Sequence, residues 1–64
     1  EVLPVTLGNY RFYHFPDATG ASHVYETYVN GICVDVMVNN IDGSACEETV
    51  LEDVESMLSE IKFS

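Results

Sequence analysis

The sequence feature that most constrains the fold is the stretch His23–Asn39, where Asn30-Gly31 separates two runs rich in β-branched and aromatic residues. A two-residue Asn-Gly connection suits a type I′ turn, because both of its central positions require a positive φ angle. The pattern therefore predicts a β-hairpin whose register is fixed by the turn, with Glu26 directly opposite Asp35.

Side chains alternate along a strand, so this register divides the hairpin into two faces. The first face is apolar enough to form a core, and it consists of Tyr25, Val29, Ile32, Val34, Val36 and Val38. The second face is mixed, and it consists of Val24, Glu26, Tyr28, Cys33, Asp35 and Met37.

A first hairpin is predicted over residues 1–16, with Gly8-Asn9 as its two-residue turn. The same counting places Tyr13 and Phe15 on the mixed face of the sheet. Pro4 cannot donate a hydrogen bond to a neighbouring strand, so we expect the first strand to lie at an edge.

After a turn-rich connection the apolar period changes from two to about 3.6, which indicates an amphipathic helix. Its apolar stripe consists of Val50, Leu51, Val54, Met57, Leu58 and Ile61. Two capping boxes are possible, Ser44 with Glu47 and Thr49 with Glu52, so the helix is expected to begin within residues 45–50.

Together these elements predict one small α+β domain over residues 1–64. It has two layers: a four-stranded antiparallel sheet made of two hairpins, and one C-terminal helix packed on one face of that sheet. A chain of 64 residues is close to the size at which a single core only just suffices.

The charge balance restricts the partners that the chain can have. Eleven acidic residues against two basic ones give a net charge of −9, which argues against direct binding to nucleic acid or to an anionic membrane surface. A cationic partner, or simple solubility, fits this charge. No apolar run is long enough for a membrane span. The chain lacks an initiator Met, which indicates a processed chain or an excised domain and leaves its compartment unknown.

Catalytic and metal sites are not predicted. His14, His23, Cys33 and Cys46 have no local zinc-ligand spacing, and the two cysteines have acidic neighbours that oppose thiolate formation. We therefore expect a non-enzymatic protein without metal or cofactor. Cys33 and Cys46 are expected to be unpaired, because the register and the helix place them on opposite sides of the sheet.

The mixed face is the predicted partner-binding surface, since a single helix leaves it uncovered and it is rich in side chains typical of interfaces. Its predicted binding residues are Tyr13, Phe15, Val24, Glu26, Tyr28, Asp35 and Met37. Glu26 and Asp35 repel each other across the strands. Solvent or Arg11 could screen the pair, or a cation of a partner could lie between them.

Two functions remain open at this level. The first is a binding or accessory module that uses the mixed face to hold a protein partner or a second copy of itself. The second is a small acidic inhibitor that blocks a basic, nucleic-acid-binding protein. Its charged strip would be the helix exterior, which carries Glu48, Glu52, Asp53, Glu55 and Glu60.

The two ends of the chain resemble a known family. The segments Leu7-Gly8-Asn9-Tyr10-Arg11-Phe12-Tyr13-His14-Phe15-Pro16 and Met57-Leu58-Ser59-Glu60-Ile61-Lys62-Phe63 are similar to the edges of PsbP-like extracytoplasmic domains and related bacterial lipoprotein modules. The resemblance covers about a third of the chain, which is much shorter than those domains. It implies a non-catalytic accessory role outside the cytoplasm and assigns no functional residue.

Overall fold

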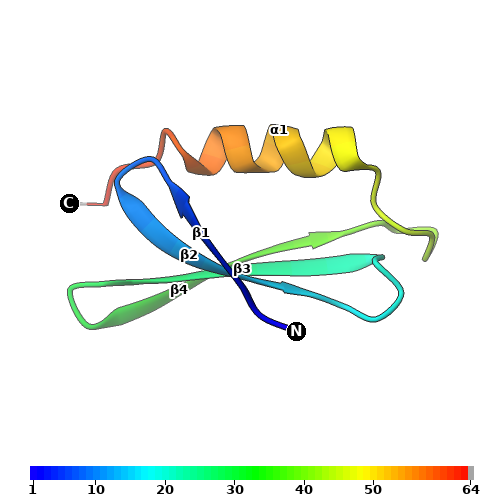
Figure 1. Ribbon diagram of the computed structural model, residues 1–64, viewed down its shortest axis with the longest axis horizontal. Coiled ribbons are helices and arrows are strands. Elements are labelled where there is room, and N and C mark those ends of the chain that lie inside the picture. Colours follow the sequence, from blue (N-terminus) through cyan, green and yellow to red (C-terminus); the bar gives the residue numbers. More distant parts are fainter. Residues whose placement is uncertain (64) are drawn as a thin grey trace.

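A computed structural model describes residues 1–63 of the chain as four strands followed by one helix (Figure 1). The elements are β1 (Leu3–Leu7), β2 (Tyr10–Pro16), β3 (Ser22–Val29), β4 (Ile32–Asn39) and α1 (Glu48–Leu58). The strands form one antiparallel sheet in the order β1-β2-β3-β4. The predicted α+β class and the two predicted hairpins are therefore confirmed.

The turn between β3 and β4 sets the predicted register. Asn30 and Gly31 have φ angles of 52° and 79°, which are the two positive values that a type I′ turn requires. Glu26 consequently pairs with Asp35, and Tyr28 pairs with Cys33.

The turn between β1 and β2 is of another kind. Gly8 has a φ of 64°, whereas Asn9 does not have a positive φ, which is the pattern of a type II′ turn. Gly8 also lies against the end of α1, where an added Cβ would overlap the carbonyl oxygen of Ser59. This glycine therefore serves both the turn and the approach of the helix to the sheet.

The buried core is small and joins β1, β2 and β3 to the end of α1. Its apolar members are Leu7, Phe12, Tyr25 and Leu58. Half-buried side chains surround this group: Val5, Tyr10, Val36, Val38, Val54 and Ile61. Thr27 is also buried, and its hydroxyl donates a hydrogen bond of 2.8 Å to the carbonyl oxygen of Arg11.

The ends of α1 differ from the prediction in detail. The helix begins within the expected range, but Glu47 is its N-cap residue and makes no side-chain capping bond. Both predicted capping boxes are therefore wrong, and the Ser44 hydroxyl instead donates to Asp42 at 2.6 Å. Ile61 lies beyond the helix and still packs on the core.

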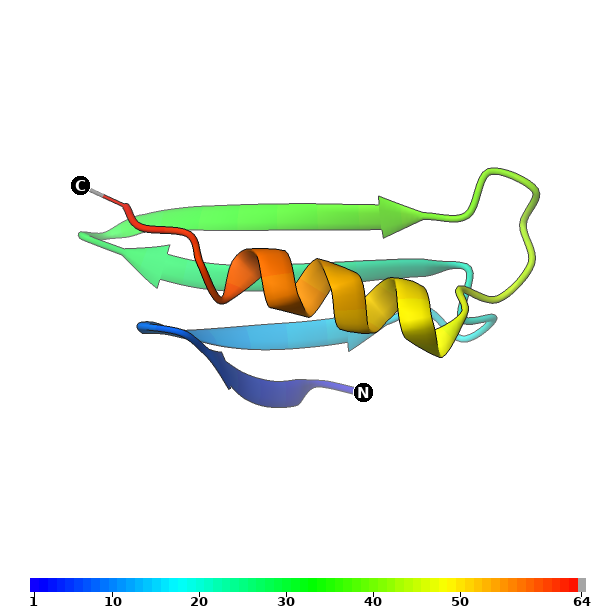
Figure 2. The same cartoon turned by 90° about the horizontal axis from the view of Figure 1, so that it is seen from above.

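The predicted core face of β4 is only partly covered. Ile32 is 64% exposed, and the helix residue Met57 is 63% exposed. Viewed from above, α1 crosses over β2 and β3 and leaves β4 clear (Figure 2). The reason is geometric, because a helix about 10 Å wide covers roughly two strands spaced about 4.8 Å apart. Among residues 1–63, α1 is too short to cross a membrane.

Candidate protein-binding face

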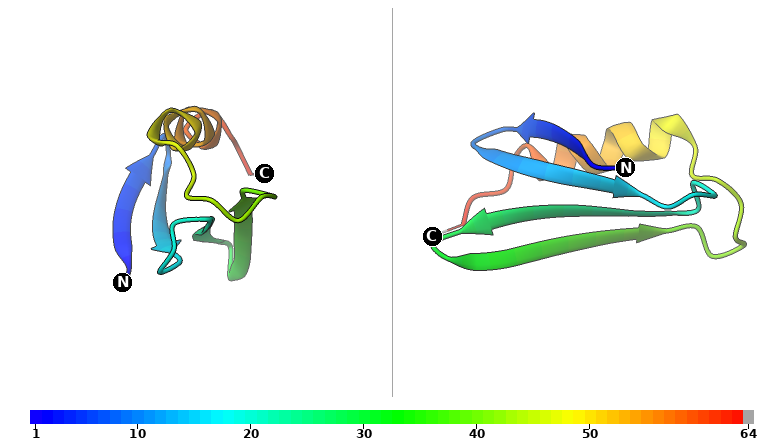
Figure 3. Two further views of the ribbon diagram at one scale, coloured as in Figure 1. Left: turned by 90° about the vertical axis from the view of Figure 1, so that its right-hand side faces the viewer. Right: turned by 60° about the horizontal axis from the view of Figure 1, so that its bottom comes forward.

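The open face is the side of the sheet turned away from α1, which is the one helix within residues 1–63 (Figure 3). We define it by the predicted binding residues: Tyr13, Phe15, Val24, Glu26, Tyr28, Asp35 and Met37. Strand pairing arranges six of them in two rows across the sheet. Phe15, Val24 and Met37 form an apolar row, and Tyr13, Glu26 and Asp35 form the row beside it.

Exposure is uneven over this face. Met37 and Tyr28 are 65% and 59% exposed, whereas Tyr13, Phe15 and Val24 are half-buried by their neighbours in the sheet. The structure thus brings all seven residues onto one surface. The large apolar side chains that stand furthest into solvent are those of β3 and β4.

Aromatic contacts hold part of the open face in place. The rings of Tyr13 and Tyr28 meet edge to face, with 6.5 Å between their centroids. The guanidinium carbon of Arg11 lies 6.0 Å from the centroid of the Tyr13 ring. The positive charge of Arg11 is therefore positioned beside the aromatic pair.

Glu26 and Asp35 meet as the sequence predicts, and Tyr28 joins them. The Tyr28 hydroxyl donates a hydrogen bond to the Glu26 carboxylate, which lowers the pKa of Glu26 and raises the pKa of Tyr28 to about 12. A hydrogen bond between the two carboxyl groups raises the pKa of Asp35. The Tyr28 hydroxyl therefore favours the ionised form of Glu26, whereas the adjacent Glu26 carboxyl group disfavours ionisation of Asp35.

Cys33 completes a cluster that could in principle hold a metal ion. Ligand atoms of Glu26, Cys33 and Asp35 all lie within 4.8 Å of one another. However, desolvation and the neighbouring carboxylates raise the pKa of the Cys33 thiol, which opposes the thiolate form that binds metals. This set differs from the four histidines and cysteines that the sequence offered as zinc ligands. Cys33 and Cys46 are both free thiols, as predicted.

The interpretation of Glu55 as a solvated residue of the helix exterior is wrong. Glu55 is half-buried, and its carboxylate accepts a 2.7 Å hydrogen bond from the hydroxyl of the buried Tyr25. Burial is the main cause that raises the pKa of Tyr25, and this hydrogen bond raises it further. The helical period alone places Glu55 near the margin of the apolar stripe. The contact itself depends on how far the long side chain of Tyr25 reaches from the sheet towards α1, which the sequence pattern does not give.

Sequence reasoning also missed a pair of histidines on the core face. His14 Nε2 lies 2.7 Å from His23 Nδ1, and the His14 ring stacks on Tyr25 with centroids 4.3 Å apart. His23 Nε2 is 3.0 Å from the carbonyl oxygen of Gly20, which can only accept a hydrogen bond. In the neutral pair His23 therefore donates to Gly20 and accepts from His14. The register between β2 and β3 could have revealed this contact. It pairs Pro16 with His23 and His14 with Tyr25, so the two histidines lie diagonally across from each other on the same face.

The histidine pair predicts a pH-dependent stability. Burial and the adjacent His23 lower the pKa of His14 below its usual 6.5, against the opposing charge of Glu55. The unfolded chain then binds more protons, so we expect the free energy of unfolding to fall as pH decreases through about 6.5. His14→Phe retains an aromatic stack on Tyr25 and should weaken this dependence. Urea denaturation at several pH values between 7.5 and 5.5 measures it, and equal slopes for both proteins would contradict the prediction.

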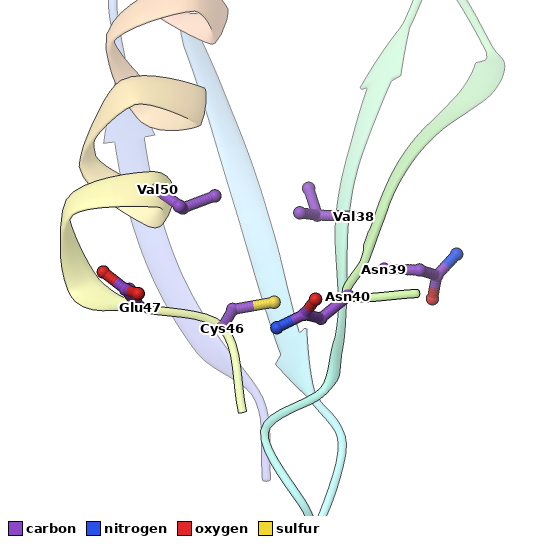
Figure 4. A pocket seen from close by; sticks show the side chains of 6 residues that line it. All are labelled: Val38, Asn39, Asn40, Cys46, Glu47 and Val50. Atoms are coloured by element: carbon purple, nitrogen blue, oxygen red, sulfur yellow. The ribbon is translucent and has the colours of Figure 1, made fainter. Parts of the chain in front are cut away.

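A small pocket lies between the end of β4 and the start of α1 (Figure 4). Its volume is about 260 Å³, and it is lined by Val38, Asn39, Asn40, Cys46, Glu47 and Val50. The Cys46 thiol is engaged by the carbonyl oxygen of Ala21 at 3.4 Å. The pocket is smaller than typical ligand sites of about 300 Å³ and above. The pocket lies where α1 does not cover the end of β4.

The fold and the open face define a small α+β protein with a four-stranded antiparallel sheet, one helix and exposed aromatic and apolar side chains on the open face. No protein-family model, curated protein or solved structure matches this chain.

Proposed function

We propose that this protein is a non-enzymatic interaction module that binds a protein partner, most simply a second copy of itself, through the open face. The observation that carries the proposal is the exposure of Tyr28 and Met37 next to the half-buried Tyr13, Phe15 and Val24. Contiguous apolar side chains with a polar rim are typical of interaction sites. The proposal treats α1 as the cover of the opposite face.

Size supports the same proposal. Within residues 1–63 the apolar core consists of four buried side chains, so a domain of this length gains stability from covering a second surface. Each Å² of apolar surface removed from water contributes about 25 cal/mol, before the cost of association is subtracted. A two-fold arrangement of two copies would bury the same open face on both chains.

The polar residues of the open face indicate which charged groups a partner would carry. Glu26 and Asp35 present adjacent carboxyl groups, and Arg11 lies beside Tyr13 on the same side of the sheet. A partner is expected to direct a Lys or Arg at the acidic pair and an acidic group at Arg11. The resemblance of the chain ends to PsbP-like domains is in line with an accessory role outside the cytoplasm.

The test is the association state of the wild-type protein and of Tyr28→Glu. We expect sedimentation velocity across micromolar concentrations to show self-association of the wild type and its loss in Tyr28→Glu, because a carboxylate at this position is costly to bury without a partner. Ile41→Glu is the matched control, since Ile41 is 100% exposed in a loop outside the open face. It should associate like the wild type.

Two results would contradict the proposal. One is a wild type that remains monomeric at all concentrations and from which no partner is recovered. The other is an equal loss of association in Tyr28→Glu and Ile41→Glu, which would show that added charge, and not this face, controls association.

An acidic inhibitor remains the second candidate, because Glu48, Glu52, Asp53 and Glu60 are all exposed along α1 and just beyond its end. Salt separates the two functions. Binding through the open face should persist or strengthen at about 0.5 M salt, since two copies of charge −9 repel each other and salt screens that repulsion. Binding of a basic protein to the acidic helix should largely disappear under the same condition.

A further inference from the structure

The two edges of the sheet are unlike each other. β1 is five residues long and contains Pro4, two features that disfavour pairing with another strand. β4 is eight residues long, and its sequence ICVDVMVN contains no Pro, Gly or Lys. In Figure 2, β4 lies at one margin of the sheet, and no strand within residues 1–63 pairs with its outer side. β4 is therefore the edge that can accept a further strand.

The hairpin register identifies which backbone groups of β4 point outward. In a two-residue hairpin the pair next to the turn is hydrogen-bonded, and bonded pairs then alternate along the strands. Val29 pairs with Ile32, so the even-numbered residues of β4 bond to β3. The bond from the Asn40 N–H to the Ala21 carbonyl oxygen continues this series. The outward N–H and C=O groups therefore belong to Cys33, Asp35 and Met37.

The side chains along this edge also suit an added strand. Val34, Val36 and Val38 are half-buried on the side of α1, so apolar residues of a neighbouring strand would find apolar partners there. On the open face, Asp35 lies next to Glu26 and is the residue of the pair nearer the edge. A strand beside β4 would place every second side chain on the open face, next to Cys33, Asp35 or Met37.

Charge decides what kind of strand fits. A second copy of β4 paired antiparallel across this edge would bring another Asp35 and Glu26 to the same face, in addition to a second net charge of −9. A strand that carries Lys or Arg on that face meets complementary charge instead. We infer that the β4 edge accepts an extended segment of a partner that alternates apolar residues with Lys or Arg, by strand addition. This inference does not depend on burial of the aromatic open face.

Amide hydrogen exchange of the ¹⁵N-labelled protein tests the inference directly. In the unbound protein, the amides of Cys33, Asp35 and Met37 should exchange quickly and those of Val34 and Val36 slowly. The probe is a blocked heptapeptide that alternates Lys and Val. At saturation it should slow exchange at Cys33, Asp35 and Met37 by about tenfold or more, because these amides become hydrogen-bonded. Two control peptides should have no effect. One has Glu in place of Lys, and the other keeps the Lys residues and their charge but has methyl groups on all of its backbone amide nitrogens.

A matched pair of variants separates the backbone edge from the open face. Met37→Pro and Met37→Ala both remove the same side chain, but only the proline removes an outward N–H. We expect the Lys peptide to bind Met37→Pro about tenfold more weakly than Met37→Ala, because the two variants lack the same side chain and differ in the outward N–H. Circular dichroism checks both folds. Exchange at Val34 and Val36 provides a further check of folding.

Three results would overturn the inference. The first is unchanged exchange at Cys33, Asp35 and Met37 with millimolar Lys peptide. The second is equal binding of the N-methylated peptide, which would indicate attraction by charge alone. The third is concentration-dependent protection of the same amides without peptide, which would show that a second copy occupies the edge. Loss of self-association in Tyr28→Glu would not affect any of these readings.

Discussion

Leu58→Ala is expected to lower the free energy of unfolding by about 2–5 kcal/mol, which is enough to leave most molecules of so small a domain unfolded. Leu58 is only 2% exposed and is the one fully buried residue of α1. It packs with Phe12 and Tyr25, so its truncation leaves a cavity where the helix meets the sheet. Urea denaturation followed by far-UV circular dichroism measures the change.

The control for this prediction is Glu52→Ala, which changes an exposed residue of the same helix to the residue with the highest helix propensity. We expect its effect to stay below about 0.5 kcal/mol. Glu55→Ala is not a neutral control, because Glu55 accepts the hydrogen bond of Tyr25. Equal destabilisation by Leu58→Ala and Glu52→Ala would mean that α1 does not anchor the core.

Gly8→Ala should also be strongly destabilising, by about 3 kcal/mol or more. Two causes act together at this position. The φ of 64° is unfavourable for alanine, and the new Cβ would overlap the carbonyl oxygen of Ser59. Because that oxygen belongs to the backbone, relief requires the end of α1 to move away from the sheet. Thermal unfolding of the variant measures the loss.

Gly31→Ala isolates the first of the two causes. Gly31 has a φ of 79°, but its added Cβ would meet no atom within 4 Å. Its cost should therefore be limited to the left-handed conformation, about 1–2 kcal/mol. Similar losses in the two alanine variants would show that the approach of Ser59 to Gly8 does not matter for stability.

Local rules predicted the strands and their pairing well, because a two-residue turn fixes the register. Asn30-Gly31 places Glu26 opposite Asp35 without reference to any other part of the chain. The composition of the open face followed from the same counting. The helix could also be predicted, since its apolar period differs clearly from that of the strands.

Contacts between elements could not be predicted in the same way. The lengths of the turns do not determine which strands α1 covers, so the exposure of Ile32 and the hydrogen bond from Tyr25 to Glu55 were missed. The pair of His14 and His23 depends on the longer connection between β2 and β3, whose register no two-residue turn defines. The first capping box failed because Ser44 is used in the turn with Asp42, and the second failed because α1 begins at Glu48, which places Thr49 inside the helix.

The four tyrosines allow one measurement to test the central claim, that the open face is a binding surface. Tyr13 and Tyr28 lie on that face, whereas Tyr10 and Tyr25 belong to the core side, where Tyr25 is fully buried. In protein labelled with 3-fluorotyrosine, the change in ¹⁹F shift between H₂O and D₂O reports the solvent contact of each ring.

We predict that the Tyr28 signal, and to a lesser degree that of Tyr13, loses its solvent shift as the protein concentration rises or as a partner is added. The Tyr25 signal should show no solvent shift under any of these conditions. A Tyr28 signal that keeps its full solvent shift throughout would contradict the account.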